Sequence, residues 1–222
     1  MKVLLINGGP RKNWSTFKML EKAADGAKDA GAEIEFINLY DISYKGCISC
    51  LACKMKNSKT EGVCAVRDDL RPILEKAHDA DAIIIGSPIY FSDTTGLSRA
   101  FMERLMYPVL SYNPKIDENG NPEMSLLDRT IPTAMIYTMG STEEAGALYS
   151  HMIEDNKNFL QMLFGYSEAL CSYDTYMLND YSRYDIADGV EERRAKQRDE
   201  QFPKDLQNAY DLGKRLAEMA KK

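Results

Sequence analysis

Four cysteines in one short stretch are the residues of this chain best suited to metal or redox chemistry. Cys47, Cys50 and Cys53 repeat at every third position, and Cys64 follows them. This spacing lets three sulfurs converge in a loop or a single helical turn, and a CxxCxxC run with a fourth cysteine is a ligation pattern of iron-sulfur clusters. The stretch therefore has the thiolates that a [4Fe-4S] cluster requires.

The distance between the third and fourth cysteines favours another interpretation. Ten residues, three of them lysines, separate Cys53 from Cys64, which is longer than the compact spacing expected of cluster ligands. A zinc site more often shows two separated CxxC pairs. A cluster, a zinc ion and free thiols in a structural loop all remain open, and the cluster is not favoured. Cys171, in a predicted strand region, is expected to be a small core residue.

Composition and charge limit the class of protein. The 222 residues are 44% hydrophobic and 28% charged, which is ordinary for a globular protein, and the net charge is -6. An acidic chain without a long basic run is not expected to bind nucleic acid. The first apolar run is too short for a signal peptide, and no later run approaches a membrane span. We therefore expect a cytoplasmic protein, in which disulfides are disfavoured.

Apolar runs alternate with helical periodicities along the chain. Strands are expected at 3–6, 34–37, 82–85, 131–138 and 172–177, and helices at 15–30, 68–77, 97–110, 143–164 and 202–220. Five strands alternating with five helices predict an α/β fold of the doubly wound, flavodoxin-like type, with a parallel sheet of order 2-1-3-4-5 and helices on both faces. We expect one domain over 1–222, with a cysteine-containing insertion at about 43–66 and a surface excursion at about 112–128.

The loop after the first strand could hold a phosphate. In such a sheet, ligands bind beyond the carboxyl ends of the strands. This loop, Gly8–Thr16, joins glycines to a helix N-terminus with hydroxyl side chains, which together favour an anion. It matches neither Walker A nor GxGxxG. The alternative is a tight turn whose Ser or Thr only caps the helix.

The loop after the third strand carries consecutive bulky groups. Tyr90 and Phe91 follow Pro88 and Ile89 where a buried strand opens to solvent. Exposing two aromatic rings is costly unless something flat covers them. The alternative is that both rings pack on the next helix.

The order of these motifs resembles the NADPH-dependent FMN reductase and iron-sulfur flavoprotein group. The resemblance covers residues 1–140 and rests on the following segments: Gly8-x-Pro10-Arg11-Lys12, Ser15-Thr16, Gly46-Cys47-x2-Cys50-x2-Cys53, Cys64, Asp68-Asp69, Gly86–Phe91 and Ala100–Arg104. It implies a flavodoxin-like fold that binds FMN, with NAD(P)H as co-substrate. Phosphate contacts are implied for Arg11, Ser15 and Thr16.

The resemblance also implies which other residues surround FMN. The implied cofactor-binding set is Gly9, Pro10, Arg11, Asn13, Ser15, Thr16, Pro88, Ile89, Tyr90, Phe91, Thr138, Gly140 and Ser141. Backbone amides of Tyr90 and Phe91 would face the pyrimidine end of the flavin and favour its anionic reduced form. Hydride transfer needs little acid or base from the protein, so no catalytic side chain is assigned. His78 and His151 are expected to be surface or structural residues.

Three functions follow from these features. The first is an oxidoreductase that passes electrons from NAD(P)H through FMN to a quinone, free flavin or another small acceptor. The second is an electron carrier with FMN and a [4Fe-4S] cluster on the four cysteines. The third is a non-catalytic flavin-binding redox sensor.

The resemblance implies a homodimer, with 112–128 and the tyrosine-rich run 179–184 as candidate partner contacts or pocket rim.

Overall fold

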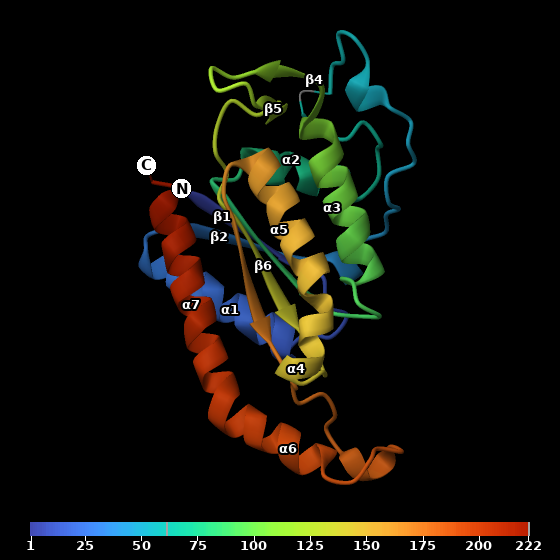
Figure 1. The fold of residues 1–222 in the computed structure, drawn as a ribbon, viewed down its shortest axis with the longest axis vertical. Helices are drawn as coiled ribbons and strands as arrows, with labels where there is room; N and C mark the ends of the chain where they lie inside the picture. Colours follow the sequence, from blue (N-terminus) through green and yellow to red (C-terminus); the bar gives the residue numbers. More distant parts are fainter. Residues whose placement is uncertain (61, 222) are drawn as a thin grey trace.

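A five-stranded parallel sheet forms the centre of the computed structural model, which describes residues 1–60 and 62–221 (Figure 1). Its strands are, in spatial order, β2 (Glu33–Asn38), β1 (Lys2–Asn7), β3 (Ala82–Pro88), β6 (Thr133–Thr138) and β7 (Ser167–Ser172). Neighbouring strands are parallel throughout. This order confirms the predicted doubly wound fold.

Helices cover both faces of the sheet. They are α1 (Ser15–Asp29), α2 (Arg71–Asp79), α3 (Gly96–Val109), α4 (Glu143–Gly146), α5 (Ser150–Phe164), α6 (Val190–Lys196) and α7 (Phe202–Met219). Side chains of α1 and α7 pack on one face, and those of α2, α3 and α5 pack on the other. None of the helices in the described part of the chain combines the length and apolar character that a membrane span needs.

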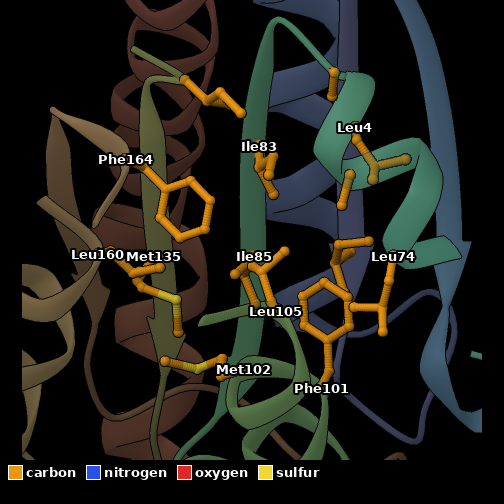
Figure 2. Packing of buried hydrophobic residues seen from close by; sticks show 14 of the residues in the cluster. Leu4, Leu74, Ile83, Ile85, Phe101, Met102, Leu105, Met135, Leu160 and Phe164 are labelled. Atoms are coloured by element: carbon orange, nitrogen blue, oxygen red, sulfur yellow. The ribbon is translucent and has the colours of Figure 1, made fainter. Parts of the chain in front are cut away.

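The middle positions of β1 and β3 form continuous apolar runs because both faces of these strands are buried. In β1, Leu4 and Ile6 belong to the cluster under α2, α3 and α5, while Val3 and Leu5 face α1 and α7. Figure 2 shows the first cluster, in which Ile83 and Ile85 of β3 lie between the side chains of the helices. Continuous apolar runs were therefore a sufficient signal for the central strands.

The last strand is placed differently from the prediction. The sequence predicts a strand at 172–177, but β7 covers Ser167–Ser172 and the chain then leaves the sheet. β7 is an edge strand paired only with β6, and four of its six residues are half-buried, so its apolar signal is weak. The aromatic residues after it resemble a strand in sequence but form part of a cavity wall, described below.

Two other segments contain more secondary-structure elements than predicted. The helix expected at 143–164 is split into α4 and α5 by a 3-10 turn at Ala147–Tyr149. The excursion at 112–128 contains a hairpin of β4 (Leu110–Ile116) and β5 (Pro122–Ser125). Within the insertion at 43–66, the regular element is a 3-10 turn at Ala52–Lys54, and residue 61 lies outside the described residues.

Helices α1 and α7 approach each other so closely that glycine is required on both. A Cβ atom on Gly26 would lie 1.9 Å from the carbonyl oxygen of Tyr210, and one on Gly213 would lie 1.9 Å from that of Ala23. Both obstacles are backbone atoms, so a side chain there forces the helices apart. The contact fixes the C-terminal helix against the helix that begins at the first candidate loop.

We expect Gly213→Ala to lower the free energy of unfolding by about 1–3 kcal/mol, because the added methyl group overpacks two backbones. Gly96→Ala is the matched control, since a Cβ atom there meets nothing within 4 Å; it should leave stability unchanged or slightly higher. Urea unfolding of both variants measures this. Equal stability of Gly213→Ala and the unmodified protein would contradict the close contact.

Candidate functional site

The ends of β1 and β3 are tied together at the carboxyl edge of the sheet. The Gly8 amide donates to the Gly86 carbonyl at 2.7 Å, and the Thr95 hydroxyl donates to the Gly8 carbonyl at 2.7 Å. A Cβ atom on Gly8 would lie 1.7 Å from Ser98 Oγ. The first two candidate loops and the start of α3 are thus held side by side.

The first loop is shaped by side chains that bond to its backbone. Asn7 accepts from the Gly9 amide at 3.0 Å and donates to the Gly9 carbonyl at 3.2 Å. The Thr16 and Thr138 hydroxyls are 2.6 Å apart, which joins α1 to the end of β6. Within the described residues, no side chain caps α1 at Trp14, so the first amides of the helix keep their donors for a ligand or water.

One cavity opens where these loops meet. Ten of the predicted cofactor-binding residues line it, namely Gly9, Pro10, Arg11, Ser15, Thr16, Pro88, Ile89, Tyr90, Thr138 and Gly140. Three predicted residues, Asn13, Phe91 and Ser141, are not part of its lining. Five further residues were not in the predicted set, namely Trp14, Met139, Thr175, Tyr176 and Met177.

The unpredicted wall at 175–177 is fixed by Asp174. Its carboxylate pairs with Arg193 at 2.5 Å and with Arg194 at 3.4 Å, and its amide donates to the Ser141 carbonyl at 2.7 Å. Hydrogen bonding to Arg193 holds the pKa of the Asp174 carboxyl below its usual range. No local sequence pattern reveals this wall. The arginine partners of Asp174 lie about twenty residues further along the chain, and Ser141 belongs to the loop after β6.

Two arginines connect this wall to the other loops. Arg194 donates to the Gly140 carbonyl at 3.0 Å, and Arg11 donates to the Met177 carbonyl at 2.7 Å. The Arg11 guanidinium also lies 4.0 Å from the centre of the Trp14 ring, within reach of a cation–π interaction. Arg11 therefore bridges the first loop and the C-terminal wall.

The second loop is a tight turn. The Tyr90 amide, one of the two expected to face a flavin, donates to the Asp93 carbonyl at 2.8 Å. Phe91 and Ser92 have φ values of 48° and 66°, a region that is strained for residues other than glycine. The Phe91 ring is fully exposed, and burial raises the pKa of Tyr90.

The four cysteines lie around a separate hollow of about 210 Å³ beside the C-terminal half of α3. Cys47 and Cys50 are exposed, whereas Cys53 and Cys64 are half-buried. Burial raises the pKa of the Cys53 thiol. No three His, Cys, Asp or Glu side chains of residues 1–60 and 62–221 are grouped to hold a single metal ion. A four-iron cluster has one thiolate at each corner, so its ligands stand further apart than those of one ion.

Arg104 fixes both ends of the cysteine segment. It is buried and donates to the carbonyls of Lys45 at 3.1 Å and Val66 at 3.2 Å. It also forms a two-pronged pair with Asp68, at 2.5 and 2.9 Å, and this hydrogen bonding lowers the pKa of the Asp68 carboxyl. Arg104 Nε has no partner among the described atoms. The segment is thereby anchored on α3 at the two points where it begins and ends.

The cysteine hollow and the loop cavity have no lining residue in common. The cavity lies at the edge where α3 begins, since Thr95 at its N-cap bonds to the first loop. Glu103, which accepts from the Cys47 amide at 3.1 Å, is seven residues beyond Gly96, or about 10 Å along the helix axis. The cavity and the cysteine hollow therefore lie beside different positions along α3.

The remaining candidates lie outside the cavity. His78 makes a long contact with Asp79, 3.4 Å between Nδ1 and Oδ1, and His151 is exposed at the start of α5. Cys171 is half-buried in β7, and burial raises the pKa of its thiol. None of the three lines the loop cavity.

Comparisons with solved structures reveal the same architecture. Azoreductase AzrA aligns with a TM-score of 0.63 at 14% identity, covering 97% of this chain and 100% of that one. The NAD(P)H:quinone oxidoreductase of Methanothermobacter marburgensis aligns with a TM-score of 0.61 at 16% identity, covering 97% and 96%. At these identities the likeness shows the fold alone.

Sequence comparisons identify relatives. An iron-sulfur flavoprotein of Archaeoglobus fulgidus is 41% identical over 104 residues, covering 47% of this chain and 48% of the relative. One from Methanocaldococcus jannaschii is 33% identical over 144 residues, covering 59% and 69%. The chain spans about half the length of several such relatives.

A family model extends over more of the chain than these pairwise matches. The model of NADPH-dependent FMN reductase matches residues 1–163, which include β1, β3, β6 and all three loops at their ends. The chain belongs to the NADPH-dependent FMN reductase family, in the group that also contains the iron-sulfur flavoproteins.

Proposed function

We propose that FMN binds in the loop cavity, with its phosphate at the start of α1. The observation that carries this proposal is the uncapped N-terminus of α1 facing a cavity built by the loops of three adjacent strands. Helix N-terminal amides and the positive end of the helix dipole favour a phosphate. The hydroxyls of Ser15 and Thr16 and the guanidinium of Arg11 line the same end.

The rest of the cavity suits a flat ring. Pro88, Tyr90 and Met139 come from the loops after β3 and β6, and Tyr176 and Met177 belong to the C-terminal wall. Arg194 joins that wall to the loop after β6, because it pairs with Asp174 and donates to the Gly140 carbonyl. When bound, FMN supplies the ability to accept a hydride and to release electrons singly or in pairs. The chain's own residues bind and orient it.

We infer an oxidoreductase that takes electrons from NAD(P)H and passes them to a quinone, free flavin or another small acceptor. The match to the NADPH-dependent FMN reductase model supports the donor. Hydride transfer depends on alignment of donor and acceptor more than on acid or base groups. This agrees with a cavity whose lining has no histidine or carboxylate.

The phosphate assignment predicts a charge-specific loss of affinity. Ser15→Asp places a carboxylate at the proposed phosphate site, and we expect the FMN dissociation constant to rise at least about 30-fold, from lost hydrogen bonds to a charged group. The dissociation constant of riboflavin, which lacks the phosphate, should rise less than fivefold. Quenching of flavin fluorescence measures both.

Asn13→Asp is the matched control for Ser15→Asp. It adds the same charge two residues away, outside the cavity lining, and should weaken FMN binding less than tenfold. An equal loss for FMN and riboflavin in Ser15→Asp would show that the phosphate is bound elsewhere.

The second candidate function is a one-electron carrier with a cluster on Cys47, Cys50, Cys53 and Cys64. The specific observation in its favour is that all four line one hollow, and relatives are named iron-sulfur flavoproteins. We prefer the reductase, because the loop cavity is complete without any cysteine.

Cysteine substitution separates the two functions. For the reductase, we expect Cys50→Ser to retain at least about half of the NAD(P)H:quinone activity, because Cys50 is exposed and outside the flavin cavity. Steady-state turnover and an iron and acid-labile sulfide assay on anaerobically prepared protein make the test. Four irons per chain, lost together with activity in Cys50→Ser, would establish the carrier instead.

We propose a homodimer whose partner covers the mouth of the cavity. Phe91, next to the lining residue Tyr90, is fully exposed, and Leu148, after α4, is 80% exposed; a partner that covers both would remove apolar surface from water. The β4–β5 hairpin lies beside the end of α3, at the opposite end of the sheet from α4 (Figure 1). It is therefore not part of this rim, whereas 179–184 follows the C-terminal wall directly.

The interface proposal predicts that Phe91→Asp converts the dimer to a monomer by placing a charge in an apolar contact. Leu126→Asp, at an exposed position directly after β5, is the control and should stay dimeric. Light scattering after size exclusion gives both masses. A monomeric unmodified protein, or a dimeric Phe91→Asp, would remove the basis of this interface.

A further inference from the structure

A second cavity lies behind the proposed phosphate site. It has a volume of about 450 Å³, within the range of about 300–1,000 Å³ common for small-molecule sites. Its lining comes from the first loop, α1, the C-terminal wall and the start of α7, namely Lys12, Asn13, Trp14, Ser15, Lys18, Tyr176, Asn179, Gln197, Arg198 and Phe202. Trp14, Ser15 and Tyr176 line both cavities, so the two adjoin at the phosphate end.

Three basic side chains line this second cavity, and two of them are paired with aspartates. Lys12 is paired with Asp41 at 2.7 Å and Arg198 with Asp199 at 2.7 Å. Lys18, one turn into α1, has no ion-pair partner among residues 1–60 and 62–221. No acidic residue contributes to the lining. An anion in the cavity would therefore meet an unneutralised lysine close to the N-terminal amides of α1.

The same cavity offers flat surfaces and an unsatisfied acceptor. Trp14 and Tyr176 line it, and the Arg198 guanidinium lies 4.6 Å from the centre of the Tyr176 ring. Gln197 Oε1 is buried without a hydrogen-bond partner in the described structure, while its Nε2 makes only a 3.5 Å contact with Asp205. A buried acceptor without a donor is costly, and a small turn of this side chain would present it to a ligand amino group.

The local backbone is also unusual. Gln197–Gln201 form a π-helical turn between α6 and α7, a geometry that is rare and frequently found at functional sites. This turn is what brings Gln197 and Arg198 to the cavity, opposite the loop that carries Asn13 in a left-handed conformation, with φ of 69°. Two irregular segments from opposite ends of the chain thus face each other across it.

We propose that the second cavity binds the adenosine monophosphate portion of a nucleotide. The adenine ring would lie against Trp14 and Tyr176 with its amino group near Gln197, and the phosphate near Lys18. This inference rests on the proposed position of FMN in the first cavity. The adenylate has two sources, namely the AMP half of FAD, whose second phosphate would continue from the flavin phosphate past Ser15, or a separate adenine nucleotide bound beside FMN.

The test is calorimetric titration of AMP into FMN-loaded protein, after the FMN affinity has been measured separately by fluorescence quenching. We expect saturable binding of one AMP without release of FMN. Lys18→Gln and Arg198→Gln should each raise the AMP dissociation constant at least fivefold and leave the FMN constant within twofold. Lys22→Gln, one turn further along α1 and outside the cavity, is the matched control and should change neither.

Comparing FAD with FMN on flavin-free protein identifies the source. FAD binding at least tenfold tighter than FMN, with the gain lost in Lys18→Gln, assigns the adenylate to FAD; equal affinities with AMP bound beside FMN assign it to a separate nucleotide. The proposal is overturned if AMP gives no saturable binding at millimolar concentration, if it displaces FMN, or if Lys18→Gln and Lys22→Gln behave alike. Failure of FMN binding would instead overturn the proposed function.

Discussion

The hydrogen bond between the Gly8 amide and the Gly86 carbonyl is the contact on which the candidate site depends. It joins the ends of β1 and β3 at 2.7 Å, and neither position has room for a side chain. A Cβ atom on Gly8 would collide with Ser98, and one on Gly86 with Leu20. The first and second loops therefore open at one edge of the sheet, and the hydroxyl pair of Thr16 and Thr138 joins the loop after β6 to them.

The sequence predicts those parts of the fold whose causes are local. A strand buried on both faces is mostly apolar, and β1 and β3 therefore stand out as continuous runs. The alternation of strands and helices, with the right-handed connections that such sheets require, limits the possible strand orders to a few. Ten of thirteen predicted cofactor-binding residues line one cavity because they lie at or after the ends of β1, β3 and β6.

The parts of the fold and of the site that the sequence does not predict depend on contacts between distant residues. β7 is half-buried at the edge of the sheet, so Ser167 and Glu168 carry no strand signal. The wall at 175–177 is defined by Asp174 pairing with two arginines on α6, which no spacing reveals. At shorter range, the sequence does not reveal that the Tyr90 amide donates to the Asp93 carbonyl within the turn. Local sequence patterns therefore locate the loops, whereas contacts between residues decide the hydrogen-bond partners of their atoms.

The cysteine segment is best understood through α3. Its N-cap Thr95 holds the ligand loops, while Arg104, about two turns later, holds both ends of the cysteine segment. Arg104 is buried and charged, and its pairing with Asp68 offsets the cost of burial. One rigid helix therefore sets the spacing between the cavity and the thiols. Because the loop cavity and the cysteine hollow have no lining residue in common, the loop cavity is complete whatever the cysteines hold, and α3 fixes the separation between the two sites.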